Sequence, residues 1–279
     1  MSSDRWLPRS QRDTDGSDYY RLRDGVPDGL RPSLLRWLGS LLDYQNQFNR
    51  DLSDDDAIFS GLERRLDRPL ADYDALKVEC LRDPDYFLDV IDVLLNSWAG
   101  ESACQQLEAM RKESRTLWRP VKTPAAWCLE RHVSQELDAT LDKTTGRPHD
   151  YLKGAWRKQF GRSPQPDGAY HDAIRAIEAA IIPAMGLTVK DPTLGKALGQ
   201  LKNNPGGYDV GFAPSRDFVG VTAVWYSLML LWKSQFDRHG TPDDDVPLNV
   251  SPEESERAVV LATAYVFGLQ NGLLRRKPG

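Results

Sequence analysis

Apolar residues recur at helical spacing along most of the chain, and polar turns separate the apolar segments. After Asp28 the leucines follow this spacing, with Pro32 tolerated in the first turn, and further amphipathic patterns follow at once. The pattern predicts N-terminal helices over about 30–42, Asp54–Leu66, Tyr73–Leu81, Pro84–Trp98 and Glu101–Ser114. The fold class is therefore mainly α.

One segment departs from helical spacing. TLWRPV and AAWCLERHV flank a KTPA turn, and their mixture of aromatic and aliphatic residues favours a short β-hairpin. A helix through Trp127 is the alternative. After Ser134 we expect a short helix and then a loop that contains Gly146 and Pro148.

The C-terminal half has clearer starts and stops. We expect helices over Tyr151–Phe160, from an Asp167 cap to about Ile181, from an Asp191-Pro192 start to Leu201, over the apolar run Phe218–Trp232, and from Ser251-Pro252 onward. The face with Ala169, Ala173 and Ala180 suits close helix packing. Four or five helices in this length predict a bundle.

These patterns divide the chain into three parts. Residues 1–27 are polar and broken by Gly16, Gly25 and Pro27, which predicts a mobile arm in which Tyr19 and Tyr20 could dock. A helical N-terminal domain then spans 28–148, and a helical C-terminal domain spans 149–279. We expect the boundary near Gly146–His149.

Charge and composition narrow the classes of function. The formal charge is -5, but residues 150–279 hold 15 Lys and Arg against 14 Asp and Glu, so the acidity lies in the first half. An acidic half disfavours broad nonspecific DNA binding. The three cysteines lack a CxxC pair, and no apolar run could span a bilayer. We expect a soluble, cytoplasmic protein without a membrane partner, a structural metal or a cofactor.

The richest polar cluster follows the apolar run Phe218–Trp232. Lys233, Ser234, Asp237, Arg238 and His239 come in quick succession, and Gly240 ends the segment. An imidazole that transfers a proton, next to cations that stabilise charge, suits phosphodiester cleavage. The alternative is an ordinary helix end, in which Asp237 pairs with a cation and His239 bonds backbone carbonyls.

The motifs that follow Tyr151 resemble a known domain. YLKGAWRKQFGRSPQPDGAYHDAIRAIEAAIIPAM, PTLGKALGQL and LMLLWKSQFDRHG resemble the C-terminal domain of bacterial abortive-infection proteins, which is related to the HEPN helical bundles. The resemblance covers about Tyr151–Leu274 and implies metal-independent RNA cleavage, often from a composite site in a homodimer. The preceding half is loosely similar to the accessory, regulatory regions of such proteins.

The resemblance also assigns roles. The family pattern is an Arg, a polar residue and then a His, which His239 matches here together with Gly240. Lys233 and Ser234 stand where the arginine and its polar neighbour belong, with five residues between Lys233 and His239. A lysine lacks the planar fork that grips phosphate, and Arg238 is the other cation available. Catalytic candidates are therefore His239, Lys233, Ser234 and Arg238.

Other polar residues give weaker signals. His171 opens the helix after the DG turn and Arg175 follows one turn later, so both are candidates for substrate binding. His132 and His149 have no metal-ligand spacing and are interpreted as structural. GGYDVGF lacks a P-loop lysine, and Asp243–Asp245 are interpreted as a solvated turn.

Two functional hypotheses result. In the first, the chain is a phage-defence toxin or effector that cleaves or binds RNA, with a phage-derived trigger or an inhibitory protein as partner. In the second, it is a noncatalytic dimerisation or sensor module with a degenerate motif.

Overall fold

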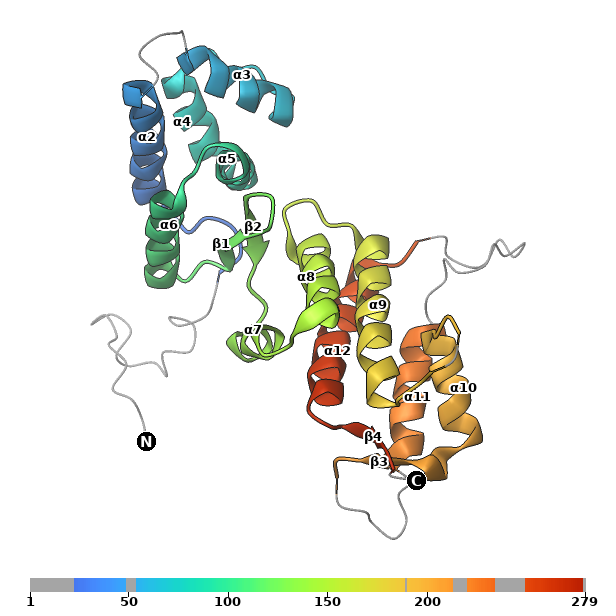
Figure 1. Cartoon of the computed structure of the whole chain (residues 1–279). Coiled ribbons are helices and arrows are strands. Elements are labelled where there is room, and N and C mark those ends of the chain that lie inside the picture. Colours follow the sequence, from blue (N-terminus) through green and yellow to red (C-terminus); the bar gives the residue numbers. More distant parts are fainter. Residues whose placement is uncertain (1–22, 49–53, 189, 213–219, 234–248, 278–279) are drawn as a thin grey trace, which may run out of the picture. The chain divides into compact units, whose positions relative to one another are not determined.

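The computed structural model describes residues 23–48, 54–188, 190–212, 220–233 and 249–277 (Figure 1). Most of these residues are helical, with two small antiparallel sheets, which confirms the mainly α fold class. The chain divides into two compact units, 1–132 and 133–279. Within the described ranges, no helix has the length and apolarity needed to cross a membrane.

The boundary between the units lies earlier than the expected Gly146–His149. Helix α7 (Gln135–Asp142) belongs to the second unit, because it packs against α8 and α12 and its Leu141 is part of the second core. The Gly146–His149 segment that we interpreted as a linker forms the first turn of α8.

The first unit is built around one strongly amphipathic helix, α5. Its buried side chains include Phe87, Ile91 and Leu94, and it contacts the neighbouring helices and the hairpin. The elements of this unit are α2 (Arg31–Phe48), α3 (Asp54–Leu66), α4 (Tyr73–Arg82), α5 (Pro84–Ser97), α6 (Glu101–Ser114), β1 (Trp118–Lys122) and β2 (Trp127–Arg131).

The β-hairpin is confirmed, and the alternative helix through Trp127 is wrong. Strands β1 and β2 pair with Trp118 opposite Arg131 and Lys122 opposite Trp127. The start of the described chain adds to this region, because Arg23 exchanges backbone hydrogen bonds with Arg115 and Leu117. The arm predicted over 1–27 is therefore anchored from Arg23 onward; Met1–Leu22, with Tyr19 and Tyr20, lie outside the described residues.

The second unit is a helical bundle with α9 at its centre. Helix α9 packs against α8, α10 and α12, and α11 packs against α10 (Figure 1). Besides α7, the elements are α8 (Gly146–Phe160), α9 (Pro166–Ala184), α10 (Leu194–Asn203), η2 (Pro205–Gly207), β3 (Tyr208–Val210), α11 (Gly220–Lys233), α12 (Pro252–Gln270) and β4 (Leu274–Arg276).

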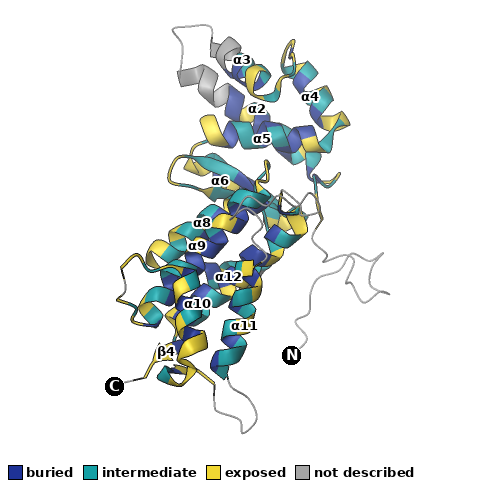
Figure 2. Ribbon diagram, turned by 90° about the vertical axis from the view of Figure 1, so that its right-hand side faces the viewer, coloured by how far each residue is buried: buried dark blue, intermediate teal, exposed yellow. Residues whose placement is uncertain are grey.

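Small residues let the helices of this bundle approach closely. The predicted face of α9 is buried at Ala169, Ala173 and Ala180, and the inward faces of the bundle are correspondingly dark in Figure 2. Trp156 of α8 fills the core and donates a 2.9 Å hydrogen bond to Thr263 of α12. A buried indole N–H thus has a partner, as burial of a polar group requires.

Several helix starts differ from expectation. Helix α9 begins with Gln165 as its N-cap and Pro166 as its first residue, so Asp167 lies inside the first turn. Helix α10 is capped by Thr193, whose hydroxyl accepts from the Lys196 amide, and Asp191 instead adopts φ 49°. At α12 the prediction is confirmed, because Ser251 and Glu254 form a capping box.

Candidate functional site at the start of α9

The predicted cluster falls mostly outside the described residues. Ser234, Arg238 and His239 belong to the segment 234–248, so the structure does not give their geometry. Lys233 is described: it is the last residue of α11, and its side chain is exposed. What the structure does describe is the scaffold on both sides of that segment.

The described chain on both sides of the segment 234–248 bonds to the first two turns of α9. On one side, the buried Tyr170 hydroxyl donates a 2.7 Å hydrogen bond to the carbonyl of Leu231, in the last turn of α11. On the other side, the Asp167 carboxylate accepts a 2.7 Å hydrogen bond from the amide of Val250. The chain on either side of the predicted cluster therefore meets the same end of one helix.

Further contacts strengthen this end of the bundle. Ser255 of α12 donates to the carbonyl of Pro166 at 2.9 Å, and the Gln159 side chain donates to the carbonyl of Pro252 at 3.0 Å. The start of α12 is thus joined to the start of α9 and the end of α8. Figure 1 shows the start of α9, the start of α12 and the end of α11 at one end of this unit.

The end of α11 is also held by α10. A Cβ atom built on Gly195 would lie 2.7 Å from a ring carbon of Trp232, so the indole occupies the space that a side chain at this position would need. Trp232 packs against the core of the unit, and Lys233 follows it. The position of Lys233 is therefore defined by contacts with both α9 and α10.

His171 and Arg175 lie one turn apart on the exposed side of α9. His171 directly follows Tyr170, so it lies at the anchored end of the helix, and it makes no hydrogen bond or ion pair with another described residue. The Arg175 guanidinium lies 4.4 Å from the centre of the Tyr151 ring and donates a 3.0 Å hydrogen bond to the Tyr151 hydroxyl. These geometries leave both candidates accessible to a ligand.

Lys158 and Asp172 form a partly buried ion pair, 2.7 Å long, beside His171. This pair was missed from the sequence, because Lys158 is on α8 and Asp172 on α9, and no spacing rule relates the two. Two glycines leave room for this ion pair. Gly154 faces the Asp172 carboxylate, and Gly168 faces the Lys158 side chain. The pair takes up most of the negative charge that Asp172 would otherwise present to an anionic ligand.

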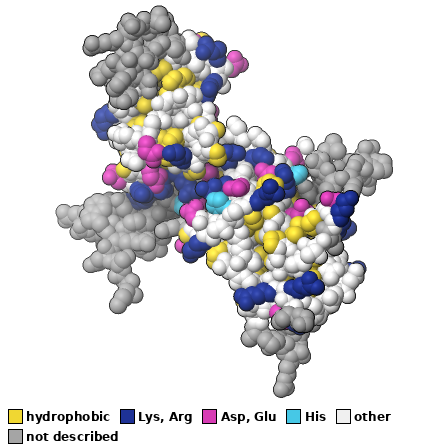
Figure 3. Space-filling view, viewed as in Figure 1, with side chains coloured by type: hydrophobic (Ala, Val, Ile, Leu, Met, Phe, Trp, Pro, Cys, Tyr) yellow, Lys and Arg dark blue, Asp and Glu magenta, His cyan; other side chains and the backbone are white. Residues whose placement is uncertain are grey.

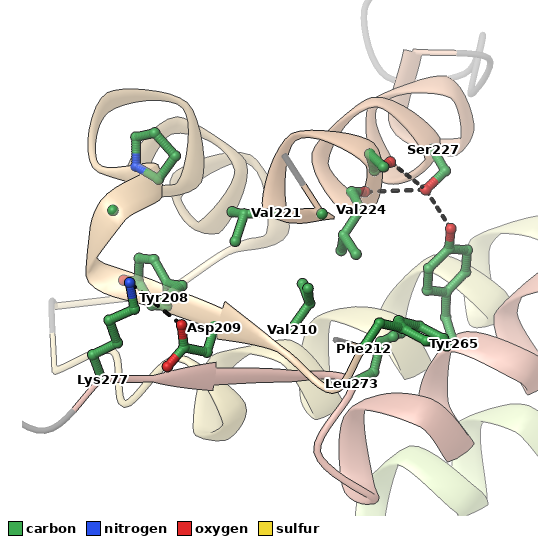
Figure 4. Close-up of a pocket in the computed structure, with 14 residues that line it drawn as sticks. Tyr208, Asp209, Val210, Phe212, Val221, Val224, Ser227, Tyr265, Leu273 and Lys277 are labelled. Carbon is green, nitrogen blue, oxygen red and sulfur yellow. Dashed lines mark hydrogen bonds and ion pairs between the residues drawn. The ribbon is translucent and has the colours of Figure 1, made fainter. Parts of the chain in front are cut away.

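A cavity of about 780 Å³ lies at the other end of α11 (Figure 4). Apolar side chains such as Val210, Val221 and Val224 line it. Four of its polar side chains pair with one another, because the Lys277 ammonium lies 3.3 Å from the Asp209 carboxylate and Tyr265 donates to Ser227. The GGYDVGF segment, which contains β3 and pairs with β4, forms one wall of this cavity. We assign it no part in the candidate site.

The remaining titratable residues behave as structural groups. His149 bonds the Thr144 hydroxyl at 2.9 Å through Nδ1, in agreement with its structural interpretation. Burial raises the pKa of the Cys80 thiol to about 12 and that of Cys104 to about 11, and none of the three cysteines forms a disulfide. Within the described ranges, no group of three or more His, Cys, Asp or Glu side chains could hold a metal ion. Asp243–Asp245 lie outside those ranges.

Comparison with known proteins adds no relative. Searches against protein-family models, curated protein sequences and solved structures find no match to this chain. The resemblance of Tyr151–Leu274 to abortive-infection domains therefore stays a prediction.

Proposed function

We propose that this chain is an abortive-infection-type effector whose C-terminal helical unit binds and cleaves RNA without a metal ion. The observation that carries the proposal is the double anchoring on α9. Tyr170 bonds Leu231 and Asp167 bonds Val250, on the two sides of the segment that contains Ser234, Arg238 and His239. A catalytic group needs a rigid support, because small displacements of reacting groups are costly.

The chemistry follows from the residue types. In RNA the 2'-hydroxyl is the nucleophile, so the protein must remove its proton, protonate the leaving oxygen and stabilise charge on the phosphate. His239 would transfer the proton. Lys233, exposed at the end of α11, would place a positive charge next to the phosphate. Arg238 is the second cation of the same segment, and Ser234 is the polar neighbour.

The test uses purified full-length protein and a labelled single-stranded RNA, with EDTA in the buffer. Wild type should cleave the RNA, whereas Lys233→Ala and His239→Ala should each lose at least about 100-fold in rate, the usual range for general acid–base and charge-stabilising groups. Lys202→Ala is the matched control, because Lys202 is also an exposed lysine in the last turn of a helix of this unit.

The outcomes are separable. Cleavage that persists in both variants would place the chemistry elsewhere, and RNA left intact by wild type would end the nuclease proposal. Cleavage that EDTA abolishes would contradict independence from metal ions.

A second candidate function, a noncatalytic dimerisation or sensor module, has one observation in its favour. Tyr226 and Leu230 lie one turn apart on α11 and are 65% and 66% exposed. Exposed apolar side chains on one helix face are typical of protein contacts. The second function replaces the first if two results are obtained together. The wild-type protein must be a dimer that Leu230→Glu dissociates, and the wild-type protein must leave RNA intact.

A further inference from the structure

The positive charge of the α8 and α9 pair lies mostly on α8, which has four Lys and Arg against one Asp. From Gly146 to Ala184 the chain has six Lys and Arg against four Asp and Glu. Figure 3 shows Lys and Arg side chains gathered over this part of the unit. A difference of two charges would be unremarkable by itself; what matters is how these charges are used.

Three of the four acidic residues are occupied within the bundle. Asp167 accepts from the Val250 amide, Asp172 pairs with Lys158, and Glu178 accepts a 2.6 Å hydrogen bond from the Leu194 amide. Each carboxylate therefore points to a partner in its own unit. Asp150 is the fourth, and it is exposed.

The cations of α8 are used differently. Arg147, Lys153 and Arg157 are all exposed, and their side chains form no ion pair or hydrogen bond with another described residue. Lys153 and Arg157 are four residues apart, so they lie on neighbouring turns of one helix face. Three of the four acids of this helix pair therefore serve the fold, whereas the exposed cations of α8 are available to a ligand.

The α8 and α9 pair also exposes a planar guanidinium group, that of Arg175. The close approach of α8 and α9, with Gly154 against Asp172, brings the Arg175 guanidinium over the Tyr151 ring at 4.4 Å. His171 is exposed one turn before Arg175. Planar guanidinium and aromatic groups stack unpaired bases, and imidazole rings do so too.

We propose that the exposed side chains of α8 and α9 bind single-stranded RNA. Lys153 and Arg157, with Arg147, would contact the phosphate backbone, while Arg175, supported by Tyr151, and His171 would stack on bases. This inference rests on the proposed function and extends it, because His171 adjoins Tyr170, the residue that holds the end of α11. The bound strand would thus lead from α8 and α9 toward the end of α11, where Lys233 lies.

The experiment measures fluorescence anisotropy of a labelled uridine-rich oligoribonucleotide with the full-length protein over a range of salt concentrations. The double variant Lys153→Glu/Arg157→Glu should weaken binding at least tenfold. Its plot of log K against log salt should be flatter by about 1.4, because each phosphate contact on a single strand contributes about 0.7 to the slope. The matched control is Lys202→Glu/Arg64→Glu, which makes the same charge change at exposed positions outside this face.

The stacking part has its own variants. Arg175→Lys keeps the charge and removes the planar group, so it should weaken binding at least about fivefold with little change in the salt slope. A duplex RNA of the same length should compete less well than the single strand, because its bases are not free to stack.

Each outcome decides between stated alternatives. If Lys153→Glu/Arg157→Glu and the control double variant weaken RNA binding equally, the proposed binding surface is wrong, because only net charge would then matter. Equal competition by duplex RNA would overturn the stacking contacts. Binding with the expected variant effects but without cleavage would support this surface and contradict the nuclease proposal. Failure of wild type to bind any RNA would overturn both proposals.

Discussion

The hydroxyl of Tyr170 donates a 2.7 Å hydrogen bond to the carbonyl oxygen of Leu231, and this bond joins the second turn of α9 to the last turn of α11. Carbonyls in the last turn of a helix depend on partners from outside that helix. Tyr170 is buried, so water is a poor substitute for its hydroxyl. The bond therefore contributes to stability and also fixes the position of Lys233, two residues further on.

Replacement of Tyr170 by Phe tests that bond. The ring stays, but the buried carbonyl loses its partner, so we expect the free energy of unfolding to fall by about 1 to 2 kcal/mol. Urea denaturation at 25 °C measures it. Tyr226→Phe is the control, because the Tyr226 side chain is exposed and the change should stay within about 0.5 kcal/mol. Equal effects of the two variants would contradict the role of the bond.

Two glycines of α10 should respond in opposite directions to the same substitution. Gly195→Ala places a Cβ atom 2.7 Å from the Trp232 ring and should destabilise the protein by about 1 to 3 kcal/mol through overpacking. Gly199→Ala meets nothing within 4 Å and should stabilise it by up to about 1 kcal/mol, because alanine favours a helix. Thermal unfolding of both variants gives the comparison. A stabilising Gly195→Ala would show that Trp232 does not pack as described.

The Asp167 carboxylate provides a test that separates stability from function. Asp167→Ala leaves the Val250 amide without its acceptor and should cost about 1 to 3 kcal/mol. Ser134→Ala removes the side-chain cap of α7 and should cost about 1 kcal/mol.

RNA cleavage below the unfolding transition should fall at least severalfold in Asp167→Ala and stay unchanged in Ser134→Ala, because Asp167, unlike Ser134, bonds Val250 next to the 234–248 segment. Equal activity in the two variants would mean that this anchor does not position the candidate residues.

The buried thiols should be unreactive at neutral pH. Burial raises the pKa of Cys80 to about 12 and that of Cys104 to about 11, with nearby carboxylates acting in the same direction. The thiolate is the reactive form, so a thiol reagent at pH 7.5 should label the half-buried Cys128 first and the other two only after unfolding. Mass spectrometry of the labelled peptides measures the order.

The sign of the associated pH effect is fixed by those raised pKa values. The folded state favours the protonated thiols, so their contribution to stability is complete below the unfolded pKa of about 9 and is lost as the pH rises toward 11 to 12. The free energy of unfolding should therefore fall above pH 9, and less steeply in Cys80→Ala. The same slope in both proteins would rule out this cause.

Local patterns were enough to predict much of the fold. Asp54–Leu66 and Glu101–Ser114 begin and end as the apolar spacing predicts, and Ser251 caps its helix as expected. These features depend on residues within a few positions of one another, which a sequence displays directly.

The errors arise where distant residues decide. Strands β3 and β4 have three residues each, and Tyr208 pairs with Arg276, which is distant along the chain. No local alternation of apolar and polar residues therefore predicts these strands. Asp167 is a residue type favoured at helix N-caps, yet its carboxylate accepts a hydrogen bond from the Val250 amide instead. The candidate site was only half predictable for the same reason: the sequence indicates His171 and Arg175, but not that Tyr151 supports the guanidinium.

The anchoring of Leu231 and Val250 on the same end of α9 also bears on how this protein could change over evolutionary time. Because Leu231 and Val250 both bond to the same end of α9, lengthening the chain between them costs little, about 0.6 kcal/mol for each doubling. Insertions and substitutions between these two residues could therefore alter specificity while the bundle stays intact. Selection could act on the recognition of a target and on the stability of the scaffold almost independently.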